Sequence, residues 1–438
     1  MRSYAGTMLE TVIRNDQIPD ERYRELDVKR GLRDLDGRGV ITGLTNISDV
    51  ISFKEENGER IPIDGELWYR GYNVRNLVKK YTETGFGYEN LAYLLLFGEM
   101  ASPEQAKEFI TLLEGSRDLP TNFTRDVIMK APTQDIMNSM TRSILTLASY
   151  DKRALETDLQ NVIRQCLNLI AVFPMLAIYA YHAYNHYENL ESMYIHRPEE
   201  GRSTAEQILM MLRPDKSCTE VEARVLDAAL MLHMEHGGGN NSTFTTRVVT
   251  SSGSDTYATI AAAMSSLKGP RHGGANIKVI QMMQDIRENV KDWNDDDEIR
   301  EYLNRMLMGA VFDHKGLIYG MGHAVYSVSD PRERIFKSFV ERLAVAKGRE
   351  DDLMLYNKIE TLAPEVIAER RRIYKGVSPN VDFYSGFVYE MLDIPRELYT
   401  PIFAIARIAG WSAHRLEEIV AMGKIIRPAY VSVMKHLE

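Results

Sequence analysis

The helical character of this chain is clearest in residues 219–240, which read TEVEARVLDAALMLHMEHGGGN. Thr219 and Glu222 form a capping-box pattern, in which each side chain bonds the other residue's backbone in the first helical turn. Apolar residues then recur near the 3.6-residue period, with further apolar residues between them. The stretch predicts a helix over 221–236 that is buried on more than one face and is ended by the glycine run.

Similar signals elsewhere predict a mainly helical, all-α fold. Capping boxes begin at Ser102, which is followed by Pro103, and at Ser203. The apolar run at 169–180 is shorter than the ~20 residues that span a bilayer, so we expect a core or subunit-interface helix there. The acidic residues at 292–298 predict a solvated loop and helix start.

One region favours strands instead of helices. Residues 39–45 and 51–54 resemble short strands, and Asn57-Gly58 lies between Phe53 and the segment 61–63. An Asn-Gly pair between apolar runs is a strong hairpin signal. The sequence therefore predicts a small strand or hairpin element near the N-terminus and little sheet elsewhere.

The composition excludes several classes of protein. The chain has 438 residues, is 44% hydrophobic and carries a formal net charge of −9, so we expect no nucleic-acid partner. The apolar run at 169–180 is too short to span a bilayer, so we expect no membrane partner either. The two cysteines, Cys166 and Cys218, are too few for a disulfide framework and fit a reducing compartment. The first residues lack the apolar stretch of a secretory signal, which makes the cytoplasm the expected location.

Three loop-like segments carry residues suited to acid–base chemistry. His272 lies in GPRHGGAN (269–276), His323 in GMGHAVY (320–326) and Asp382 in PNVDFYSG (379–386). Two imidazoles and a carboxylate can remove a proton from carbon and place one on oxygen near neutral pH. From spacing alone, the histidines could also be ordinary loop or core residues, and Asp382 a helix cap.

The other candidates are basic. Arg332 follows Asp330-Pro331, a turn leading into a helix. Arg407 lies in the apolar segment 402–409, where a charge needs an ion pair or an anionic ligand. His233 and His236 could share a helix face as a metal pair, but the zinc pattern His-Glu-x-x-His is missing, so no metal is expected.

The three motifs, in this order, resemble the citrate synthase family. Further anchors of the resemblance are LWYRGY (67–72), ENLAYLLLFG (89–98) and NSTFTTRVV (241–249). The resemblance runs from about Gly39 to near the C-terminus. It implies a two-domain helical fold, with a large domain over 1–273 and 391–438 and a small CoA-binding domain over 274–390, in a homodimer or a multiple of dimers.

The resemblance also implies an activity and roles for residues. The family condenses acetyl-CoA with oxaloacetate and water to give citrate and CoA. Asp382 resembles the base, His272 the donor to the thioester oxygen and His323 the acid that polarises the ketone. The implied oxaloacetate ligands are His236, Arg332, Arg407 and, from the other subunit, Arg427.

The resemblance implies no separate cofactor, because the CoA thioester is itself a substrate. It also implies five residues that contact CoA. They are Gly320, Met321, Gly322, Lys375 and Asn380. Two positions depart from the family, Gly237 where Glu is usual and Ser327 where Lys or Arg is common. Alternatives are a 2-methylcitrate synthase that uses propionyl-CoA, a catalytically silent CoA-binding paralogue and a metalloprotein built on His233 and His236.

Overall fold

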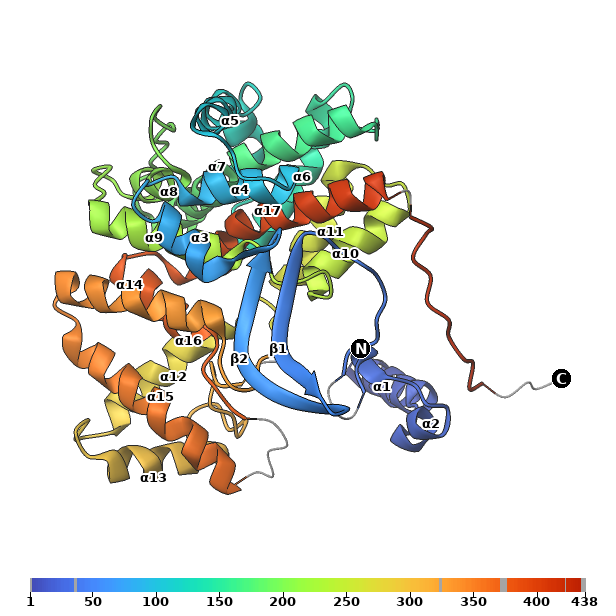
Figure 1. Ribbon diagram of the computed structural model, residues 1–438, viewed down its shortest axis with the longest axis vertical. Coiled ribbons are helices and arrows are strands. Elements are labelled where there is room, and N and C mark those ends of the chain that lie inside the picture. The colour runs from blue at the N-terminus through green and yellow to red at the C-terminus, as the bar shows by residue number, and fades with distance from the viewer. Residues whose placement is uncertain (1, 35–37, 323–324, 371–375, 422, 435–438) are drawn as a thin grey trace. The chain divides into compact units, whose positions relative to one another are not determined.

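The computed structural model describes residues 2–34, 38–322, 325–370, 376–421 and 423–434 (Figure 1). Its contacts divide the chain into two units, residues 1–44 and 45–438. The first unit contains α1 (Arg2–Asp16), α2 (Asp20–Glu25) and a short 3₁₀ turn, η1 (Arg30–Leu32). The second unit contains the candidate site residues and is described below.

The second unit is mainly helical, as the sequence predicts. Its strands are β1 (Ser48–Glu56), β2 (Glu59–Tyr69) and β3 (Tyr72–Asn73). Its helices are α3 (Val74–Tyr81), α4 (Gly87–Phe97), α5 (Pro103–Gly115), α6 (Ile136–Leu147), α7 (Leu159–Asn189), α8 (Thr204–Leu212), α9 (Glu220–His233), α10 (Asn241–Ser251), α11 (Thr256–Lys268), α12 (Ala275–Asn289), α13 (Asp296–Leu307), α14 (Pro331–Lys347), α15 (Glu350–Arg370), α16 (Val381–Met391) and α17 (Tyr399–Val420). Short turns are η2 (Thr124–Ile128), η3 (Ala148–Tyr150) and η4 (Arg396–Leu398).

The predicted hairpin is confirmed. Strands β1 and β2 pair antiparallel from Ser48 with Tyr69 to Glu56 with Glu59, and β3 adds to β2. Asn57 and Gly58 both have positive φ, of 54° and 81°, which suits a tight hairpin turn. The predicted strand over 39–45 is wrong: Gly39 makes an isolated bridge with Arg33, and residues 40–45 have no regular structure.

The core of the second unit forms around α7 and α17. Helix α17 contacts α7, α4, α9 and α10, and Figure 1 shows it running between α4 and the α10–α11 pair. Helix α7 is long and apolar enough to cross a membrane, but 83% of its most apolar window is buried inside the protein. The segment 169–180 is therefore part of a core helix, one of the two locations that the sequence predicts.

The predicted helix starts are confirmed, but one helix end is wrong. Capping boxes form at Ser102, Ser203 and Thr219. Helix α9 ends at His233, three residues before His236. The Tyr69 hydroxyl lies within hydrogen-bond distance of the carbonyls of Met231 (3.2 Å) and Glu235 (3.1 Å). It therefore offers a partner to backbone groups that a longer helix would pair internally. His233 and His236 therefore do not share a helix face.

Helices α12 to α16 pack on one another and carry part of the candidate site. Helix α16 contacts α12 and α14, and α15 contacts α13 and α14. Helix α14 also contacts α9, α3 and β2. These helices span residues 275–391. Their range is close to that of the predicted small domain, 274–390, whose boundaries stay a prediction.

Candidate active site

Asn380 fixes the start of the helix that carries Asp382. Its side chain caps α16 by accepting from the Asp382 N–H (3.0 Å), and its Nδ2 donates to the Gly322 carbonyl (2.8 Å). The Gly322 N–H donates to the Ser378 carbonyl (2.7 Å), and the Asn380 N–H donates to the Gly320 carbonyl (2.9 Å). The structure thus joins segments 320–322 and 378–380, which contain four of the five predicted CoA contacts.

Asp382 lies in an environment that makes a carboxylate more basic. Burial raises its pKa to about 6, against the opposing charges of Arg332 and Arg407 and with support from Asp330. Among the described residues, none donates a hydrogen bond to its carboxylate. Asp382 is therefore largely ionised at neutral pH and is a stronger base than an exposed aspartate.

Arg332 is held by a buried carboxylate two residues away. Asp330 caps α14 and accepts from Arg332 Nε (3.0 Å) and Nη2 (2.7 Å). Both residues are buried, and Asp330 Oδ2 also accepts from the Val381 N–H (3.3 Å). Asp330 therefore ties the start of α14, with Arg332, to the start of α16, with Asp382.

Arg407 is a buried cation without an ion pair among the described residues. Its Nε donates to the carbonyl of His233 (2.6 Å), whereas its Nη1 is buried and has no hydrogen-bond partner there. Burial lowers its pKa to about 10, against the charge of Glu235. The guanidinium would be stabilised by an anionic ligand at this position.

The His272 side chain is a neutral imidazole. Its Nε2 lies 3.0 Å from Ser242 Oγ and 3.4 Å from the Ser242 backbone nitrogen, while Trp411 Nε1 donates to Ser242 Oγ (3.1 Å). The Ser242 hydroxyl also lies 3.0 Å from Asn240 Oδ1, so the ring nitrogen that carries the proton depends on which of these two neighbours receives the hydroxyl hydrogen. Burial, and to a smaller degree the charge of Arg407, lowers the pKa of His272 to about 4, so the ring stays uncharged near neutral pH.

His236 lies in the loop after α9, with its ring edge against Tyr326 at 5.4 Å between centroids. The neighbouring Glu235 Oε1 accepts from Ser48 Oγ (2.8 Å) and from the Gly237 N–H (2.7 Å), and lies 3.0 Å from His414 Nε2. Burial opposes its ionisation, but the His414 imidazole and these bonds hold the pKa of Glu235 at about 2. The buried carboxylate fixes the loop that carries His236.

The glycine that departs from the family pattern fits a left-handed turn in this loop. Gly237 has a φ of 86°, which glycine adopts without strain. A Cβ at this position would lie 3.2 Å from Val50 Cγ2. A glutamate here would be strained in this backbone conformation. The other departure, Ser327, is buried.

One predicted site residue, Arg427, is not assembled with the others, and two lie outside the described residues. Arg427 is exposed on the extended segment 423–434, where the neighbouring Ile426 N–H donates to Ser251 Oγ (3.0 Å). His323 and Lys375 lie outside the described residues. Within the described ranges, no group of three or more His, Cys, Asp or Glu side chains could hold a metal ion.

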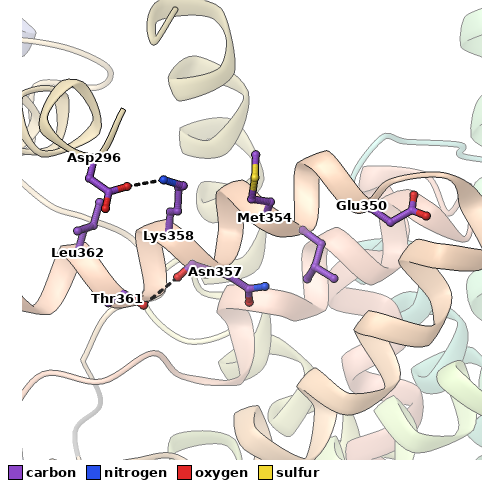
Figure 2. Close-up of a pocket in the computed structure, with 8 residues that line it drawn as sticks. Asp296, Glu350, Met354, Asn357, Lys358, Thr361 and Leu362 are labelled. Carbon is purple, nitrogen blue, oxygen red and sulfur yellow. Dashed lines mark hydrogen bonds and ion pairs between the residues drawn. The ribbon is translucent and has the colours of Figure 1, made fainter. Parts of the chain in front are cut away.

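A pocket of about 440 Å³ lies apart from these residues, between the start of α13 and α15 (Figure 2). Asp296 and Lys358 form an ion pair at one end, and Glu350 lies at the other. None of the candidate site residues lines this pocket. We assign it no part in the chemistry.

Sequence reasoning missed the residues that orient the candidates. Ser242, Asp330 and Trp411 each bond a site residue or its partner, and Ser242 and Trp411 come from α10 and α17. Asp330 has a local signal, because it stands two residues before Arg332 at a helix start. Ser242 and Trp411 are 169 residues apart, so only the folded chain shows that they meet.

Electrostatic influences connect four of the candidates. The charges of Arg332 and Arg407 act on Asp382, and that of Arg407 also acts on His272. A basic carboxylate, a neutral imidazole and two buried arginines are groups suited to ionising a weak carbon acid beside an anion.

Comparison with known proteins agrees with this chemistry. The family model described as citrate synthase, C-terminal domain, matches residues 32–429, and the chain belongs to the citrate synthase family. A citrate synthase from Synechocystis sp. is 34% identical over 85% of this chain and 86% of the relative. A 2-methylcitrate synthase from Shewanella oneidensis is 32% identical over 84% of this chain and 89% of the relative.

Solved structures show the same fold. The citrate synthase of Pyrobaculum aerophilum has a TM-score of 0.74 and 27% identity, with 91% of each chain covered. The citrate synthase of Thermoplasma acidophilum, solved as a ternary complex with carboxymethyl coenzyme A and oxaloacetate, has a TM-score of 0.76 and 24% identity over 93% of this chain and 97% of that chain. The predicted family, fold class and enzyme class are therefore confirmed.

Proposed function

We propose that the protein condenses acetyl-CoA with oxaloacetate and water to give citrate and CoA. The observation that carries this proposal is Asp382, whose pKa is raised to about 6 while two buried arginines lie within electrostatic reach. A thioester methyl group is a very weak carbon acid, so its ionisation needs a base and an oxygen donor acting together. Asp382 and His272 supply these two groups.

The reaction proceeds by proton transfer and then carbon–carbon bond formation. Asp382 takes a proton from the acetyl methyl group, and the His272 Nδ1–H bonds the thioester oxygen as the enolate forms. His323 polarises the ketone of oxaloacetate, whose carbon the enolate attacks. Water then cleaves the thioester of citryl-CoA, which releases citrate and CoA.

Oxaloacetate is a dianion, which suits the cationic groups of the site. Arg332, Arg407 and His236 bind its carboxylates in this proposal. The buried Nη1 of Arg407, which has no partner among the described residues, supports a ligand there. Arg332 keeps its position through Asp330, so its guanidinium is ordered before the substrate arrives.

The CoA portion lies along the joined segments 320–322 and 378–380. Its contacts in this proposal are Gly320, Met321, Gly322 and Asn380. Lys375, which the structure does not describe, is a fifth proposed contact. The backbone bonds between the two segments support a preformed edge for this ligand. No metal or further cofactor takes part.

The working form is a homodimer or a multiple of dimers, and Arg427 completes the site of the other subunit. The exposure of Arg427 on an extended segment supports this arrangement.

The proposed location is the cytoplasm. Cys166 and Cys218 are both unpaired, which supports a reducing environment.

The second candidate function is 2-methylcitrate synthesis from propionyl-CoA, which the relative from Shewanella oneidensis favours. One methylene group changes binding by only ~1–3 kcal/mol, so the two substrates can share this site. The test compares kcat/KM for CoA-thiol release from acetyl-CoA and propionyl-CoA with oxaloacetate. A higher value for acetyl-CoA supports the first function, a higher value for propionyl-CoA supports the second, and no release from folded protein indicates a silent paralogue.

A further inference from the structure

A groove of about 510 Å³ lies between α3, α9 and α14. Helix α14 contacts both α3 and α9 (Figure 1), and residues of all three helices line the groove. Its volume falls within the usual range of small-molecule sites. None of the residues assigned to the condensation lines it.

The groove is strongly cationic. Arg75 and Lys79 reach it from α3, Arg224 from α9, and Arg334 and Arg342 from α14. Glu83 is the one carboxylate among the described residues that line it. The whole chain carries a net charge of −9, so a generally basic surface does not explain this concentration of positive charge.

Three of these cations lack a carboxylate partner. Arg224 pairs with Glu220, and Arg334 lies 3.1 Å from Asp64. In the described part of the chain, no ion pair is formed by Arg75, Lys79 or Arg342. Their charges repel one another across the groove, and an anion between them would relieve that repulsion.

The cations form rows on facing helices. Arg75 and Lys79 stand four residues apart on α3, and Arg334 and Arg342 stand eight apart on α14, so each pair lies on one helical face. Rows of this kind can bind several negative groups along one ligand. A single carboxylate or phosphate would reach only part of either row.

The floor of the groove is apolar. Val78, Ile335 and Phe339 line it between the cations, and Thr82 and Ser338 add hydroxyl groups. Arginine and lysine recognise phosphate groups, and an apolar floor accepts a flat or aliphatic portion of the same ligand.

We propose that this groove is a binding site for a polyphosphorylated small molecule, separate from the candidate active site. The proposal rests on the groove alone and does not depend on the condensation activity.

The direct test measures binding by calorimetry with two probes, inorganic tripolyphosphate and ATP, at low ionic strength and without metal ions. We expect the wild-type protein to bind at least one probe with a Kd below about 1 mM. Equal affinities show that the phosphate chain alone is recognised, whereas tighter binding of ATP shows that the apolar floor holds the nucleoside. Absence of binding by both probes at this concentration overturns the proposal.

Variants locate the binding. The double charge reversal Lys79→Glu with Arg342→Glu should weaken binding at least about tenfold. Lys107→Glu, a single reversal of the same kind on the exposed face of α5, is the control and should leave the Kd unchanged. Affinity that persists in the double variant places the ligand elsewhere and overturns the proposal. A milder double variant, Lys79→Gln with Arg342→Gln, replaces the charge reversal if that variant fails to fold. Its fold is checked by circular dichroism, and its loss of affinity should be smaller than that of the charge reversal.

Discussion

Asp330 and Arg332 form a buried ion pair through two hydrogen bonds, of 3.0 and 2.7 Å. The same carboxylate accepts from the Val381 N–H at the start of α16. One side chain thus orients a proposed oxaloacetate ligand and positions the helix of the proposed base. Its negative charge also raises the pKa of Asp382.

Replacing Asp330 should destabilise the protein and weaken oxaloacetate binding. Asp330→Asn removes the carboxylate charge that pairs with the buried Arg332 guanidinium, and removing one partner of a buried ion pair costs about 3–5 kcal/mol. Denaturant unfolding measures the loss of stability, and the KM for oxaloacetate should rise. The matched control is Asp64→Asn, whose exposed pair with Arg334 should contribute less than about 1 kcal/mol. Equal effects of the two variants would contradict the role of Asp330.

Removing the proposed base should affect turnover and leave binding intact. Asp382→Ala deletes the group that takes the methyl proton, so kcat should fall about 10²–10⁴-fold. Oxaloacetate still meets Arg332 and Arg407, so its Kd from calorimetry should change little. Turnover close to that of the wild type would remove Asp382 from the role of base.

The raised pKa of Asp382 predicts an acidic limb in the rate profile. The base acts only when ionised, so kcat/KM should fall about tenfold per pH unit below pH 6 and level off above it. His272, whose pKa is about 4, stays neutral over this range and contributes no second limb there.

Asp330→Asn provides the control for this assignment. The Asp330 charge raises the pKa of Asp382, so its removal should move the acidic limb below pH 6. A limb that stays near pH 6 in this variant would show that another group controls it.

The tautomer of His272 should depend on Ser242. Ser242→Ala removes the hydroxyl between Trp411 and the His272 ring, so Nε2 loses the interaction that, in the proposed mechanism, keeps the proton on Nδ1. We expect kcat to fall about 10–100-fold, with an unchanged Kd for oxaloacetate. The exposed Ser252→Ala, whose hydroxyl donates to the Val249 carbonyl (2.7 Å), is the matched control and should behave as wild type. Equal turnover of the two variants would show that Ser242 does not set the tautomer.

The sequence predicted what local patterns determine. Capping boxes at Ser102, Ser203 and Thr219 and the Asn57-Gly58 hairpin are local signals, and each is confirmed. Near the end of α9, the Met231 carbonyl lies within hydrogen-bond distance of the hydroxyl of Tyr69, which is 162 residues away in the sequence. Local patterns cannot show this contact, and they predict a helix end at His236, three residues too late. The motifs likewise identified His272 and Asp382, but the support of Ser242 and Trp411 arises only when α10 and α17 pack together.

Arg427 should act across the dimer interface, where it can be tested by mixing defective subunits. An Asp382→Ala subunit lacks the base of its own site but supplies an intact Arg427 to its partner. An Arg427→Ala subunit retains Asp382, so a heterodimer of the two contains one complete site and should recover up to about half of the wild-type activity per dimer. Homodimers of either variant serve as controls, and co-purification with two different tags verifies the mixed species. Verified heterodimers without recovered activity would show that Arg427 does not complete the partner's site.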